Sequence, residues 1–377
     1  MKLTNDMEFE AIIFDIDGVL VDVRKSYNGA IIKTVQIILQ EVFEINNSTD
    51  YPFEVMISKL RNTGGFNNDI DTTYAIILIL LYCVLIKKMD SNKTIEMFED
   101  IIKKLDEKGK DSLEKELERD SDIQSIREKL NYPYGTEDLI SSRFNEIFYG
   151  SKLFKEQFKK EPMRYFDDPL IYNDIVIINE ETIRLLSQAF SGNLGLISGR
   201  SKVASYFTLG KLIKYFNEDA CVFLEDEKRE HSKPNTFSLH RVFDKLNLKN
   251  ALYVGDSMAD LLMVENYREE TNKDRIFFCG IYGEGDEINK SIKKDKIVRN
   301  DGITDIINNS QIKINRSDIN ITTTSSSDNT KNIHKSFLIQ NNNRLSLLRK
   351  KLFESKNADI VIENVNDLPN ILNITKN

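Results

Sequence analysis

Two carboxylates stand directly after an apolar run near the N-terminus. Residues 11–14, Ala-Ile-Ile-Phe, have the composition of a buried strand, and Asp15, Asp17 and Gly18 follow them. A short apolar run that stops at such residues predicts a buried strand ending in a tight loop. Since side chains alternate in direction along an extended chain, one acid can act as a nucleophile while the other carries protons. Taken alone, the segment can also be interpreted as a strand followed by an ordinary Asp-Gly turn.

Further polar groups follow three later segments of the chain. They are Ser198-Gly199-Arg200 after the apolar run 194–197, the step Lys233-Pro234, and Asp256 with Asp260 after the run 251–254. Ligands of open α/β sheets bind beyond the carboxyl ends of the strands, so we expect these groups to meet the two N-terminal acids at one rim. Asp260 lies one helical turn after Asp256, which places both acids on the same helix face.

Each of these groups also has a simpler interpretation. Ser198 and Gly199 could form only a turn, and Lys233 could be a surface lysine. Lys228 is a rival for the position of an active-site lysine, because it lies only five residues earlier. The predicted strands and helices must therefore show whether these groups meet before either interpretation can be chosen.

Strand and helix signals alternate after about residue 180. Apolar strand-like runs are found at 194–197, 220–224, 251–254, 276–279 and 358–362. Strands separated by helical segments imply parallel βαβ units with right-handed crossovers, so we predict an α/β fold with a doubly wound parallel sheet. The strand before Asp15 belongs to the same sheet. The region from about residue 25 to 158 has helical periodicity and is predicted to be a helical domain inserted after that strand.

These signals divide the chain into three parts. We predict a catalytic core made of residues 1–23, 180–285 and 344–377, and a helical domain at 24–179. Residues 286–343 are rich in Asn, Ser, Thr, Ile and Lys, with a Thr-Ser run at 322–327. This composition predicts a surface insertion with a disordered middle, although its alternating isoleucines could also form an edge hairpin.

Composition limits the partners and the compartment. The formal net charge of −8 argues against nucleic acid or an anionic membrane as the main partner. Three scattered cysteines without a C-x-x-C pair indicate free thiols in a reducing compartment. The N-terminus lacks the pattern of a signal peptide, and the apolar run 74–86 has only about half the length of a membrane span. We therefore expect a cytoplasmic protein.

The polar groups, in chain order, resemble the motifs of the haloacid dehalogenase superfamily of phosphohydrolases. The match consists of D-x-D-G-V at 15–19, an apolar strand ending in Ser198, the step Lys233-Pro234 and G-D-x-x-x-D at 255–260. The family often has a second proline after this step, where the present chain has Asn235-Thr236. The dehalogenases lack the second acid of the first motif, so Asp17 favours a phosphatase or phosphotransferase. The helical domain resembles the cap of the phosphoglycolate-phosphatase-like subfamily, IA.

The resemblance implies a role for each residue. Asp15 would be the nucleophile and Asp17 the general acid and base, while Lys233 would offset negative charge. The phosphoryl group would be bound by Ser198, Gly199, Arg200 and Lys233. Mg²⁺ would be the cofactor, held by Asp15, Asp256 and the Asp17 backbone carbonyl, with Asp260 as a water-mediated ligand.

A further segment, Gly64 to Asp71, resembles a hypothetical-phosphatase branch of the subfamily. Its Asn67 and Asn68 could place hydrogen-bonding groups over the active site and bind substrate. Alternatively, Asn68 or Asp69 could simply cap the long apolar helix that follows.

The function predicted from these observations is Mg²⁺-dependent hydrolysis of a small, phosphoglycolate-like organophosphate through an aspartyl-phosphate. A phosphomutase of the same superfamily and a non-catalytic binding or regulatory protein with the same fold are the alternatives. The expected partner is a small phosphorylated metabolite, without nucleic acid or membrane, and the expected state is a monomer or homodimer.

Overall fold

The computed structural model describes residues 9–45, 51–66, 68–132, 138–164, 168–271, 276–283 and 346–374. The predictions for Asn67 and for the insertion 286–343, including its alternative hairpin, lie outside the described residues. The three cysteines of the chain are described and are free, as predicted.

A parallel sheet forms one half of the molecule. Its strands are β1 (Ile12–Phe14), β4 (Leu194–Ser198), β5 (Cys221–Phe223), β6 (Ala251–Gly255), β7 (Ile276–Ile281) and β8 (Ile360–Ile362). They pair in the order β5-β4-β1-β6-β7-β8, and every pairing is parallel. The predicted α/β fold with a parallel sheet is confirmed, and β1 lies near its centre, as a fully apolar run requires.

Helices cover both faces of this sheet. This is seen at β1 and the residue before it, where alternate side chains pack into two different apolar clusters. Ile12 and Phe14 pack with one cluster, whereas Ala11 and Ile13 pack with the other. The helices of this half are α8 (Glu180–Ala189), α9 (Lys202–Leu209), α10 (Phe237–Leu246), α11 (Met258–Thr271), a helix at 346–355 and α14 (Leu368–Ile371). This arrangement is the doubly wound architecture that the alternating signals predict.

The strand register brings the predicted motifs to one edge. Phe14 of β1 lies opposite Leu196 of β4 and Val254 of β6. Asp15, Ser198 and Asp256 therefore leave three adjacent strands at the same carboxyl-terminal edge. Binding sites of open α/β sheets form at this position.

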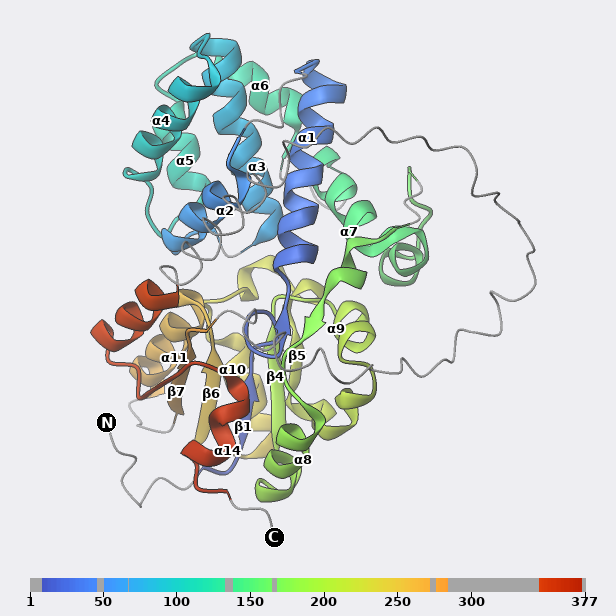
Figure 1. Ribbon diagram of the computed structural model, residues 1–377, viewed down its shortest axis with the longest axis vertical. Coiled ribbons are helices and arrows are strands. Elements are labelled where there is room, and N and C mark those ends of the chain that lie inside the picture. The colour runs from blue at the N-terminus through green and yellow to red at the C-terminus, as the bar shows by residue number, and fades with distance from the viewer. Residues whose placement is uncertain are drawn as a thin grey trace, which may run out of the picture.

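A helical unit, α1 to α7, lies between β1 and the rest of the sheet in the sequence. Figure 1 shows α1 to α6 gathered at the end of the molecule away from the sheet. Its helices are α1 (Gly29–Phe43), α2 (Phe53–Asn62), α3 (Asp69–Leu81), α4 (Ser91–Ile102), α5 (Lys110–Leu117), α6 (Ile123–Leu130) and α7 (Leu139–Phe158). Their apolar side chains form a separate core cluster. The domain boundaries at 23/24 and 179/180 stay predictions.

The connection between the two halves contains a strand pair that the sequence does not predict. The first strand ends at Phe14, and a short antiparallel pair follows, β2 (Val21–Asp22) with β3 (Ile175–Val176). This pair joins the two chain segments that lead into and out of the helical unit. Because its partners are more than 150 residues apart in sequence, no local signal predicts it.

The apolar run in α3 is the core helix of the helical unit. Within the described residues, the segment Asp69–Ile86 has the length and hydropathy of a membrane span, and 61% of this window is buried. Residues 72–81 are all buried, and α3 contacts α1, α2, α4, α5, α6 and α7. A helix that is apolar on every side in this way fits the centre of a helical bundle.

Candidate active site

Asp15 is the first residue after β1, and its surroundings hold it in place. Its backbone N–H donates to the Val254 carbonyl at 2.9 Å, and its Oδ1 accepts from the Ile16 N–H at 2.7 Å. The residue is 7% exposed. Burial raises the pKa of Asp15 well above its usual range, although the nearby Lys233 ammonium opposes this effect.

Lys233 lies between two carboxylates of the site. Its Nζ is 3.0 Å from Asp15 Oδ2 and 2.8 Å from Asp260 Oδ1. Burial favours the neutral amine, but the two carboxylates outweigh it and raise the pKa of Lys233, so the side chain is charged. By contrast, the Lys228 side chain is 77% exposed and pairs with Glu230 at the surface. The geometry therefore places Lys233, rather than Lys228, beside the predicted nucleophile.

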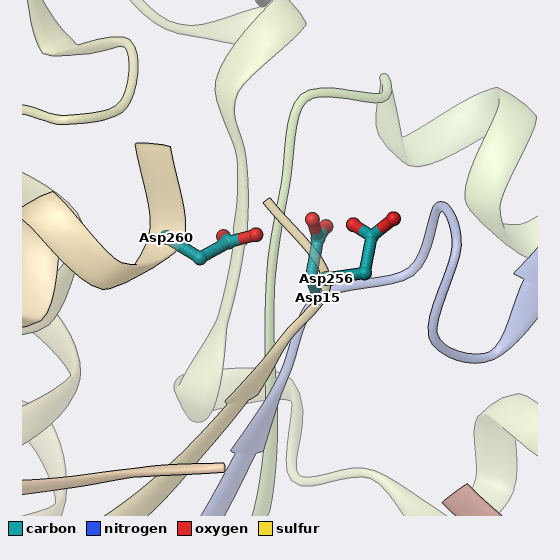
Figure 2. A group of neighbouring side chains, drawn as sticks. All are labelled: Asp15, Asp256 and Asp260. Atoms are coloured by element: carbon teal, nitrogen blue, oxygen red, sulfur yellow. The ribbon is translucent and has the colours of Figure 1, made fainter. Parts of the chain in front are cut away.

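Three carboxylates converge at this edge of the sheet. Ligand oxygens of Asp15, Asp256 and Asp260 all lie within 4.8 Å of one another. Figure 2 shows that they come from the ends of β1 and β6 and from the first turn of α11, with the Asp260 carboxylate pointing toward the other two. A cluster of carboxylate oxygens is the donor set that Mg²⁺ prefers.

Asp260 is the most firmly held acid of the three. Its Oδ1 accepts from the Tyr253 hydroxyl at 2.8 Å, and its Oδ2 accepts from the Ser257 hydroxyl at 2.6 Å. Burial would raise the pKa of Asp260, but Lys233 and these hydrogen bonds together keep it below the usual value. Asp260 is therefore ionised near neutral pH.

Gly18 allows the loop after β1 to approach Asp256. Its φ of 75° lies in the left-handed region, and a Cβ built on it would be 2.0 Å from Asp256 Oδ2. Burial raises the pKa of Asp256 to about 6, opposed by Arg349. Asp15 and Asp256 thus carry raised pKa values, chiefly because they are buried and in smaller part because neighbouring acids repel their charges. A divalent cation would relieve this repulsion, so the residues present fit Mg²⁺.

Asp17 is not one of the three clustered acids, and its carboxylate pairs with Arg200. Arg200 Nε donates to Asp17 Oδ1, and its Nη1 donates to Asp174 Oδ2 at 2.8 Å. Burial raises the pKa of Asp17 to about 6 even against the Arg200 charge. A carboxyl group with this pKa can hold or release a proton near neutral pH, which suits acid–base work.

The Arg200 side chain is fully buried and contacts four other side chains. Besides its two ion pairs, Nη1 donates to the Thr208 hydroxyl at 3.0 Å, and the guanidinium lies over the Tyr27 ring. Its Nη2 is buried and has no hydrogen-bond partner among the described residues. An unpaired buried donor of this kind is costly.

The remaining predicted phosphate ligands lie at the end of β4. Ser198 is buried, and its Oγ accepts from the Arg200 backbone N–H at 3.3 Å. Gly199 between them is exposed, and a Cβ built on it would meet no atom within 4 Å. The segment is thus a turn that also carries a serine hydroxyl to the edge of the sheet beside Asp15.

Asn68 behaves as a helix cap. Its side-chain Oδ1 accepts from the Ile70 N–H at 2.9 Å and the Asp71 N–H at 3.1 Å, which satisfies two free donors of α3. Of the two interpretations of this segment, the structure shows the capping one for Asn68. Asn67 lies outside the described residues.

Several residues of the site were missed by sequence reasoning. Tyr253 and Ser257 hold Asp260, Asp174 holds Arg200, and Arg349 pairs with Asp256 at 3.7 Å. The serine directly after Asp256 could have been noticed, because serine often caps a helix that starts there. Asp174 and Arg349 lie far from any motif, and the sequence offers no signal for them.

The comparison with known families identifies the class of the protein. The haloacid dehalogenase-like hydrolase family matches residues 9–267, about two thirds of the chain, and the chain belongs to this family. The matched stretch includes the three clustered acids and Lys233. It ends before β7, so the helix at 346–355 lies outside it. No curated protein sequence matches the chain at a significant level.

Solved structures with a similar arrangement are distant. A phosphatase from Thermococcus thioreducens, Tt82, is 24% identical, with a TM-score of 0.48 over 72% of this chain and 92% of its own. A haloacid dehalogenase-like protein of unknown function from Agrobacterium tumefaciens is 13% identical, with a TM-score of 0.42 over 97% of this chain and 98% of its own. A subfamily IA hydrolase from Geobacter sulfurreducens is 16% identical, with a TM-score of 0.34 over 73% and 90%.

Proposed function

We propose that this hydrolase is a Mg²⁺-dependent phosphomonoesterase that acts through an aspartyl-phosphate on Asp15. The observation that carries the proposal is the meeting of Asp15, Asp256 and Asp260 at one sheet edge, with Lys233 between two of them. Displacement at a phosphate monoester requires a nucleophile, charge neutralisation and a proton for the leaving oxygen, and this edge carries groups for all three.

Asp15 and Asp17 divide the reaction between them. An Asp15 oxygen forms a bond to phosphorus as the bond from phosphorus to the leaving alkoxide breaks, and Asp17 donates the proton that the alkoxide takes. Asp17 then removes a proton from water as the water oxygen attacks phosphorus and releases Asp15. The pKa of Asp17, raised to about 6 by burial, supports both directions of proton transfer near neutral pH.

Other residues of this chain stabilise the phosphoryl group. Lys233 neutralises part of the charge that Asp15 and the phosphate carry together, and Ser198 and the free Nη2 of Arg200 donate hydrogen bonds to phosphoryl oxygens. Arg200 also holds the Asp17 carboxylate through a charged hydrogen bond. Asp15, Asp256 and the Asp17 backbone carbonyl would hold Mg²⁺, with Asp260 behind them; when bound, the ion supplies Lewis-acid charge for the phosphoryl oxygens.

The proposed substrate is a small phosphorylated metabolite, phosphoglycolate-like as in the subfamily that the chain resembles. The helical unit would supply contacts to its leaving group and exclude bulk water from the edge of the sheet. We further propose a cytoplasmic enzyme that is a monomer or homodimer.

The direct test is hydrolysis of p-nitrophenyl phosphate and a panel of phosphorylated metabolites by the purified chain, with and without Mg²⁺. We expect phosphate release with Mg²⁺, loss of activity in EDTA, and a loss of at least about 10³-fold in kcat for Asp15→Asn, since a nucleophile is removed. The matched control is Asp244→Asn, an exposed acid on α10. Equal turnover by Asp15→Asn and the unchanged chain would overturn the mechanism, and an isomerised sugar phosphate without free phosphate would indicate a mutase.

A further inference from the structure

Arg349 brings a cation to the carboxylate cluster from outside the family's matched region. It lies on the helix at 346–355, which follows the insertion and packs on the sheet through the fully buried Phe353. Its Nη1 is 3.7 Å from Asp256 Oδ2. Residues 9–267 carry the family motifs, so this contact is a feature of the chain's own C-terminal part.

The two cations of the site are held very differently. Lys233 is 9% exposed and lies within 3.0 Å of two carboxylate oxygens. Arg349 is 31% exposed, and its 3.7 Å separation from Asp256 is an ion pair longer than a hydrogen bond. Lys233 is thus part of the fixed framework, whereas Arg349 sits on a long, partly solvated stem that can move away.

A divalent ion and the Arg349 guanidinium compete for the Asp256 carboxylate. The Asp256 carboxylate is 18% exposed, so it needs a nearby positive charge. A divalent ion bound to the same carboxylate would lie within a few ångströms of Arg349 and repel it.

We propose that Arg349 is the exchangeable counter-ion of Asp256, which neutralises this acid in the metal-free protein and gives way when a divalent cation binds. Arg349 is therefore a positioning residue that keeps Asp256 in place for the metal and lowers the affinity of the site for it. The inference rests on the proposed metal site and adds a residue that tunes it.

The exchange predicts whether Mg²⁺ binds more tightly or more weakly after Arg349 is replaced. Removing a residue with only a structural role would loosen the site and weaken metal binding. Removing a competing charge would strengthen it, and we expect Arg349→Gln to lower the Kd for Mg²⁺ by at least about threefold, since a unit charge near the ion is lost. Arg349→Lys keeps the charge and should remain within about twofold of the unchanged chain.

The experiment is isothermal titration of the EDTA-treated, desalted full chain with MgCl₂, without substrate. Lys351→Ala is the matched control, because it removes one positive charge from an exposed position of the same helix. Asp256→Asn identifies binding at this site, and circular dichroism checks that each variant is folded. If Arg349→Gln does not fold, Arg349→Met retains the stem and gives the same comparison.

The outcomes separate the two proposals. Tighter Mg²⁺ binding by Arg349→Gln, with Lys351→Ala unchanged, supports the exchange. An equal or larger Kd for Arg349→Gln overturns it and leaves the proposed function standing. An unchanged chain that binds no Mg²⁺, or binds it equally well after Asp256→Asn, overturns the metal site of the proposed function and the exchange with it.

Discussion

At the scale of single residues, the site depends on how close its backbone and acids come to one another. The loop after β1 passes so near Asp256 that Gly18 has no room for a side chain. Cations and hydroxyls hold the acids: a lysine lies between Asp15 and Asp260, an arginine lies beside Asp17, and two hydroxyls donate to Asp260. Small changes here should therefore affect chemistry more than folding.

Gly18→Ala tests this close approach. Its Cβ would meet Asp256 Oδ2 at 2.0 Å, so the loop or the acid must move, and we expect kcat/KM for p-nitrophenyl phosphate to fall by at least about 10²-fold. The φ of 75° adds a stability loss of about 1 kcal/mol.

Gly192→Ala is the matched control for the backbone strain. Gly192 has a φ of 81°, but a Cβ built there would meet no atom within 4 Å. It should lose similar stability in urea denaturation and keep its activity. If both variants lost activity equally, the clash with Asp256 would not be the cause.

At the scale of elements, the strand ends bring the site residues together. A few polar contacts connect this region to the helical unit. Arg229 lies in a short helical turn, Arg229–His231, that leads to Lys233. Its Nη2 donates to both oxygens of Asp71 in the first turn of α3, and Asp71 also accepts from the Tyr132 hydroxyl. The loop that leads to Lys233 is thus bonded to the helical unit.

Arg229→Ala tests whether this bridge matters for catalysis. Loss of the bridge should let the helical unit and the lysine loop separate more easily. The Arg229 side chain is 54% exposed, so we expect a modest effect, about a two- to fivefold fall in kcat/KM. Steady-state hydrolysis of p-nitrophenyl phosphate measures it.

The control for the bridge is Arg241→Ala, which removes an arginine paired with Glu227 within the sheet half. The double variant Arg229→Ala with Asp71→Asn should lose no more than Arg229→Ala alone, because both act on one contact. Additive losses, or an Arg229→Ala variant as active as the unchanged chain, would argue against the bridge.

At the scale of the whole molecule, the buried acids couple the free energy of unfolding to pH and metal. The pKa of Asp256 is raised by burial from 3.8 to about 6. The folded protein therefore holds this proton after the unfolded chain has released it. Stability from this group is fully present below about pH 4 and is lost as the pH rises through 6.

Asp256→Asn should remove this pH dependence in the metal-free protein. We expect the variant to be more stable than the unchanged chain by about 1–3 kcal/mol at pH 7.5, with the difference vanishing near pH 4. Urea denaturation in EDTA at several pH values measures the difference. Mg²⁺ should reverse the order at pH 7.5, because it binds the folded unchanged chain. A difference between the two proteins that does not vary with pH would contradict the proposed titration.

Much of this fold follows from local patterns. The runs before Asp15 and Asp256, and the run that ends in Ser198, are short, apolar and followed by polar residues, which is how buried parallel strands appear in a sequence. Their alternation with helices predicts the parallel sheet, and the parallel sheet predicts that the motifs meet at one edge. The helical unit is visible for the same reason, since its periodicity is local.

Residue types and spacing were sufficient to identify the α/β class and to select Asp15, Asp256 and Asp260 as candidate site residues, because these signals are carried by neighbouring residues. They left Lys233 and Lys228 as alternatives for the lysine of the site. Only the tertiary structure decided which charges face which. It paired Asp17 with Arg200, joined β2 to β3, and brought Arg349 to Asp256 across more than 90 residues of chain. Such contacts depend on packing between distant segments, and no pattern within either segment records the partner.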